Sequence, residues 1–89
     1  MFKSLSTDMS ALEAALYQCG LRALDRSVRG SEALAYEEAL VQLVLVVATL
    51  VTRDEVPQIK FQFERGEAAA HLPGGDSVTV PVCLCCARH

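Results

Sequence analysis

The sequence predicts a two-layer α+β domain, with two helices followed by a small antiparallel three-stranded meander sheet that has an exposed edge strand. Two patterns support this fold class. Apolar residues recur at steps of three and four in the first half of the chain, which is typical of helices. From Ile59 onward apolar and polar residues alternate, which is typical of strands with one buried face. At 89 residues, the chain is expected to form one domain, residues 1–89.

The first helix is predicted to begin after Ser10. Ser10 and Glu13 form a capping-box pattern, in which each side chain satisfies a backbone amide near the other residue. Gly30 is a suitable place for the helix to end. Gly20 costs a helix about 1 kcal/mol relative to alanine, so the sequence is compatible with a bend or break there. One apolar stripe is formed by Leu12, Ala15, Leu16, Cys19, Ala23 and Leu24.

The second helix is predicted from Glu32 to about Val51, with Ser31 as its cap and an acidic first part that suits the helix dipole. Residues 40–51 are rich in β-branched side chains and are also compatible with a buried strand. The acidic lead-in and the length favour a helix. It carries two apolar stripes and is expected to be buried on several sides. The stripes are Tyr36, Leu40, Leu43, Val47 and Leu50, and beside them Val41, Val44, Ala48 and Val51.

A loop at residues 53–57 leads to three predicted strands. The first covers residues 59–64, the second residues 68–72, and the third begins near Val78. Pro81 has no amide hydrogen, which predicts that the third strand lies at an edge of the sheet. We expect the second helix to cover the sheet face that carries Ile59, Phe61 and Phe63.

Composition predicts that the protein acts by contacts with other proteins. Apolar residues make up 52% of the chain and the mean hydropathy is +0.28, which is more apolar material than a small monomer easily hides. We therefore expect a small non-enzymatic interaction or accessory protein that acts as a homo-oligomer or within a larger complex. Short acidic proteins of phages and mobile elements offer an analogy. The candidate interface residues are Tyr36, Leu40, Leu43, Val47, Leu50, Val80 and Val82.

Charge and motifs argue against several other functions. The net charge of −3 and the scattered basic residues disfavour nucleic-acid binding, and Arg22, Arg26 and Arg29 are interpreted as a solvated helix face. His71 has no acidic residue beside it, and the chain contains neither a GxSxG elbow nor a phosphate loop with its lysine. We expect no catalytic residues, no cofactor-binding residues and no enzyme activity.

The sequence predicts a cytoplasmic protein without a membrane partner. Asp8 and Glu13 interrupt the N-terminal apolar residues, so this segment does not resemble a secretory signal. The longest apolar stretch, residues 39–51, is shorter than the roughly 20 residues of a membrane-spanning helix. The four cysteines are accordingly expected to be reduced thiols.

The C-terminal CxCCxxH cluster is the one place where metal chemistry is considered. Cys83, Cys85, Cys86 and His89 supply enough ligands for zinc, although the spacing differs from the usual paired CxxC knuckles. The favoured interpretation is that these cysteines are small apolar residues, since unpaired cysteine is often buried. A zinc-dependent domain and a thiol-dependent domain remain alternatives.

Residues 30–82 resemble a GerMN (sporulation and germination) domain. That family typically has a helix ending in an LVxTLT-like stretch, a short loop and a strand of the form V-x-x-V-x-F-x-x-[DE]-G. The segment Leu43–Leu50 and the segment VPQIKFQFERGE fit this pattern, with Gly66 at the hairpin position. The resemblance implies a non-catalytic module that binds partners in an envelope complex.

Overall fold

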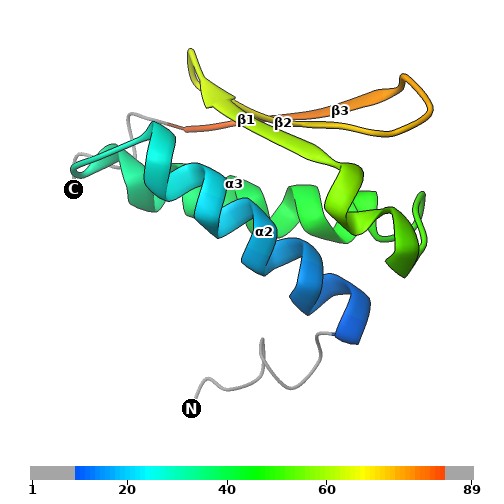
Figure 1. Ribbon diagram of the computed structural model, residues 1–89. Coiled ribbons are helices and arrows are strands. Elements are labelled where there is room, and N and C mark those ends of the chain that lie inside the picture. The colour runs from blue at the N-terminus through cyan, green and yellow to red at the C-terminus, as the bar shows by residue number, and fades with distance from the viewer. Residues whose placement is uncertain (1–9, 84–89) are drawn as a thin grey trace.

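The computed structural model describes residues 10–83 and confirms the predicted α+β class. Two helices form one layer and a three-stranded antiparallel sheet forms the other (Figure 1). The elements in chain order are helices α2 (Ala11–Ser27) and α3 (Glu32–Val47), the 3₁₀ helix η1 (Arg53–Gln58), and strands β1 (Lys60–Glu64), β2 (Glu67–His71) and β3 (Ser77–Pro81).

Helix α2 begins with the predicted capping box. The Glu13 N–H donates to Ser10 Oγ at 3.2 Å, and the Ser10 N–H donates to Glu13 Oε1 at 2.9 Å. Helix α2 has no break at Gly20 and continues through this residue to Ser27. Gly20 is buried against the side chain of Leu40, so its missing Cβ allows the two helices to approach closely.

Residues 40–47 are helical, which excludes the alternative of a buried strand. The helix ends at Val47, four residues earlier than predicted, and the chain then tightens into a turn. The amide of Thr49 donates to the carbonyl of Val46 at 3.0 Å, and the amide of Leu50 donates to that of Val47 at 2.9 Å. These bonds span three residues instead of four, as is common where a helix ends.

The segment predicted as a loop after α3 is the 3₁₀ helix η1. At its start, the amide of Thr52 donates to Glu55 Oε1 at 2.9 Å, and the amide of Glu55 donates to the carbonyl of Thr52 at 3.0 Å. Pro57 lies inside η1 and Val56 is buried against the core. This short helix therefore anchors the connection between α3 and β1 to the core.

The sheet has the strand order β1-β2-β3, and both helices cover the same face of it. Helix α2 packs on β1, whereas α3 packs on β2 and β3 (Figure 1). The second helix was expected to cover the face that carries Ile59, Phe61 and Phe63, and the structure shows that α3 shares this face with α2. In the register, Phe63 is opposite Ala68 and Ala68 is opposite Val80. Ala68 is fully buried, and its small side chain leaves room for α3, which packs on β2.

Strand β3 is an edge strand, as Pro81 predicted. The Val82 amide donates to the Gly66 carbonyl at 2.8 Å, so at Val82 the backbone points toward β2. Backbone direction alternates along a strand, and the nitrogen of Pro81 therefore points away from β2 toward the open edge. The proline costs no hydrogen bond within the sheet at this position.

Tyr36 joins the helix layer to the sheet layer. Its ring is 3% exposed and packs edge-to-face on Phe63, with ring centroids 6.2 Å apart. Its hydroxyl oxygen accepts a hydrogen bond from the Gly66 amide at 2.9 Å. Gly66 has a φ of 73° in the tight turn between β1 and β2, so this contact fixes the hairpin over α3.

Candidate interaction surfaces

Four of the predicted interface residues lie in the core of the chain itself. Tyr36, Leu40, Leu43 and Val47 are each 3% exposed or less, because their face of α3 meets α2 and the sheet. A surface formed by α3 must consist of other side chains. Of the remaining predicted residues, Leu50 is exposed, whereas Val80 and Val82 are half-buried against the core cluster.

The opposite face of α3 carries an apolar strip that we call the outer stripe, formed by Leu34, Glu38, Val41, Leu45 and Ala48. Leu34 is 68% exposed and Leu45 is 47% exposed. The residues follow one another at steps of four, three, four and three, which is the spacing of a coiled-coil seam. Leu50, which is 56% exposed, lies just beyond the end of the helix.

The sequence contained a signal for the outer stripe, because Leu34, Val41 and Ala48 recur every seven residues. Periodicity alone placed Val41 and Ala48 in the same set as Val44. The structure separates them: Val44 is fully buried, whereas Val41 and Ala48 are half-buried.

A narrow groove of about 120 Å³ lies beside the outer stripe, between α3 and the end of β3. Glu38 lines the groove and also belongs to the stripe, so the two features form one continuous surface. The groove includes Val82 from the predicted interface. Its lining residues are Ala35, Glu38, Ala39, Gln42, Pro81, Val82 and Cys83.

The predicted C-terminal metal cluster falls mostly beyond the structure's described range. Cys83 is exposed and is the last described residue, whereas Cys85, Cys86 and His89 lie outside the described residues. Within residues 10–83, no three His, Cys, Asp or Glu side chains are grouped so that they could hold a metal ion. Zinc binding by the cluster stays a prediction.

His71 belongs to a hydrogen-bonded row on the sheet face away from the helices. Its Nε2 lies 2.8 Å from Gln62 Oε1 and its Nδ1 lies 2.9 Å from Ser77 Oγ. The amide nitrogen of Gln62 donates to Glu64 Oε2 at 2.8 Å. Since Gln62 Oε1 only accepts, Nε2 carries a proton and the row links β1, β2 and β3. All four side chains are exposed, so these hydrogen bonds link the three strands at the protein surface.

A second cross-link joins the two helices. The Tyr17 hydroxyl donates to Glu37 Oε2 at 2.9 Å. Burial raises the pKa of Tyr17 to about 12, with further contributions from the hydrogen bond to Glu37 and from the negative charge of that carboxylate. Tyr17 therefore remains a donor to Glu37 well into the alkaline range.

Comparisons with protein-family models, curated proteins and solved structures found no match to this chain. Among the helices within residues 10–83, none is both long enough and apolar enough to cross a lipid bilayer.

Proposed function

We propose that this chain is a small, non-enzymatic interaction protein of the cytoplasm that pairs with a second copy of itself through the outer stripe of α3. The observation that carries the proposal is the exposure of Leu34 and Leu45 on a helix whose other face already fills the core. Burying a leucine or valine side chain contributes about 1.5–3 kcal/mol. Each copy would bring several such side chains to the contact.

The pattern of the outer stripe favours an antiparallel pair. If two copies of α3 pack antiparallel about Val41, Leu34 lies level with Ala48 of the second copy, and Leu45 lies within one residue of the level of Glu38 of the second copy. A parallel pair would place Glu38 opposite Glu38 in the middle of the contact, where two like charges repel. Both arrangements can have the two-fold symmetry that is commonest among identical chains, so the charge of Glu38 decides between them.

The groove between α3 and β3 supports a contact wider than one helix. A stable protein interface usually buries more than about 1,000 Å² in total, which a short stripe alone does not supply. The groove adds Val82 and the polar side chain of Gln42 at the border of the stripe. A partner-binding role within a larger complex, as the GerMN resemblance of residues 30–82 implies, would use the same surface.

The test compares two substitutions at Leu45 that remove the same apolar side chain and introduce opposite charges. In the antiparallel pair, Leu45→Glu faces Glu38 of the second copy and should weaken the dimer about tenfold or more, a difference of roughly 1.4 kcal/mol. Leu45→Lys faces the same carboxylate and should retain substantially more of the dimer. Sedimentation equilibrium over a concentration series measures both dissociation constants.

Gln18→Glu is the matched control, because Gln18 is exposed on α2 and the substitution changes the net charge by the same amount as Leu45→Glu. The control should leave the dissociation constant unchanged. A monomeric wild-type protein at every concentration would contradict self-association. Equal losses in Leu45→Glu and Leu45→Lys would contradict the antiparallel arrangement.

A further inference from the structure

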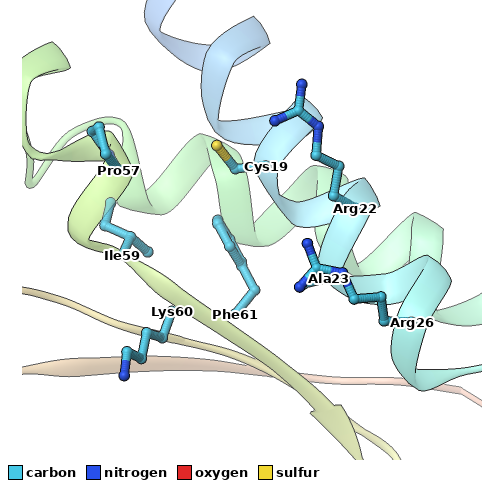
Figure 2. Close-up of a pocket in the computed structure, with 8 residues that line it drawn as sticks. All are labelled: Cys19, Arg22, Ala23, Arg26, Pro57, Ile59, Lys60 and Phe61. Atoms are coloured by element: carbon cyan, nitrogen blue, oxygen red, sulfur yellow. The ribbon is translucent and has the colours of Figure 1, made fainter.

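A cavity of about 430 Å³ lies where α2, η1 and β1 meet, and no residue of α3 is among those that line it (Figure 2). Its apolar part is formed by Ala23 of α2, by Pro57 of η1 and by Ile59 and Phe61. Phe61 is half-buried, so part of its ring is open to the cavity. This volume lies within the range of small-molecule sites, about 300–1,000 Å³.

One border of the cavity is cationic. Arg22 and Arg26 lie one helical turn apart on α2, and both are exposed. Figure 2 shows Arg26 reaching from the helix toward Phe61. Lys60 also lines the cavity, but its amine points away from α2, toward the other side of the strand. The positive charge at the cavity therefore comes from the two arginines.

No acidic side chain forms an ion pair with either arginine in the described part of the chain. No aspartate or glutamate is among the residues that line the cavity. Asp25 is their neighbour in sequence, yet no ion pair joins it to Arg22 or Arg26 within residues 10–83. Two like charges four residues apart on a helix repel slightly, by a few tenths of a kcal/mol. A bound anion would relieve this repulsion in a chain whose net charge is otherwise negative.

We propose that the cavity binds a small organic anion, with its carboxylate or phosphate head on Arg22 and Arg26 and its apolar body against Ala23 and Phe61. A guanidinium group is suited to such a head because its planar donors match two oxygens at once. The apolar lining selects against inorganic anions, which have no body to bury there. The site is separate from the outer stripe of α3 and does not depend on self-association.

The experiment titrates ¹⁵N-labelled protein with 1-naphthoate and, separately, with 1-naphthyl phosphate, and follows the backbone amide resonances. Saturable shifts are expected at Cys19, Ala23 and Phe61. The tighter of the two probes identifies the head group. Neutral 1-naphthalenemethanol should bind at least tenfold more weakly, because it lacks the charge that the arginines contact. Shifts confined to the outer stripe of α3, or no saturable shifts with either anion, would overturn the proposal.

Three variants test the arginines. Arg26→Gln and Arg22→Gln should each weaken the binding of the preferred probe about tenfold, since each removes a charged hydrogen-bonding partner. Arg29→Gln changes the net charge by the same amount, but Arg29 lies beyond α2 and outside the cavity lining. It should leave the affinity within about twofold. An equal loss in Arg29→Gln would show that the probe responds to overall charge, which would overturn the site.

Discussion

Gly20 sets how closely the two helices approach. A Cβ atom at this position would overlap the side chain of Leu40, which is fully buried and has little space to move. We expect Gly20→Ala to lower the free energy of unfolding by up to about 2 kcal/mol. Overpacking costs about 1–3 kcal/mol, and the better helix propensity of alanine returns about 1 kcal/mol. Urea unfolding measures the difference.

Gly74→Ala is the control, because no atom lies within 4 Å of a Cβ at Gly74 and its substitution should change little. The double variant with Leu40→Val should recover part of the loss of Gly20→Ala, since valine is one carbon shorter. If Gly20→Ala were more stable than the wild type, the close approach of the helices would not limit packing at this position.

At Tyr36 one hydroxyl group links α3 to the β1–β2 hairpin. Tyr36→Phe keeps the ring against Phe63 and removes only the acceptor for the Gly66 amide. The variant should lose about 1 kcal/mol of stability, the usual contribution of one such hydrogen bond. The substitution should also increase the rate of amide hydrogen exchange at Gly66 more than at the amides of α2. Unchanged exchange at Gly66 would mean that this bond does not restrain the hairpin.

Between the two helices, the Tyr17–Glu37 bond predicts an alkaline loss of stability. Because the pKa of Tyr17 is raised to about 12 in the folded protein, the unfolded chain releases this proton first, from its ordinary pKa near 10. The contribution of Tyr17 to the free energy of unfolding is therefore complete below pH 10 and is lost as the pH rises from 10 to 12. Partial exposure screens the effect, so we expect about 1 kcal/mol.

The measurement is urea unfolding at pH 9, 10, 11 and 12 for the wild type and for Tyr17→Phe. Phenylalanine has no proton to lose, so the variant should show a smaller decrease over this range. Parallel curves for the two proteins would show that the alkaline loss arises from other groups.

At the level of elements, local sequence signals predicted where the helices begin and which segments are strands. They did not predict which elements pack against one another. The Ser10–Glu13 box and the alternation from Ile59 to Glu64 depend on neighbouring residues, and both correspond to observed elements. Periodicity shows which face of an element is buried, but not which element covers it. The sharing of the sheet between α2 and α3 therefore escaped prediction, as did the role of Gly20 in helix packing.

For the whole molecule, the apolar surplus predicted an exposed apolar surface but not its position. Helix α3 is apolar around most of its circumference, so Leu40 and Leu45 are equivalent in a pattern of residue types. Only the position of the sheet decides that Leu40 is buried and Leu45 is exposed. The same holds for Arg22 and Arg26, which were interpreted as a solvated face. Their cavity exists because η1 and β1, which follow much later in the chain, fold beside them.

The proline at the open edge of β3 affects how chains can associate at high concentration. Chains that join strand to strand expose a new edge with each addition, so such growth continues into fibres. The nitrogen of Pro81 points outward at that edge and offers no hydrogen to an incoming strand. The two-fold contact proposed for the outer stripe of α3 would, by contrast, be complete after two chains. The fold thus disfavours continued strand addition at the β3 edge of its sheet. The contact proposed through the outer stripe would end at a dimer.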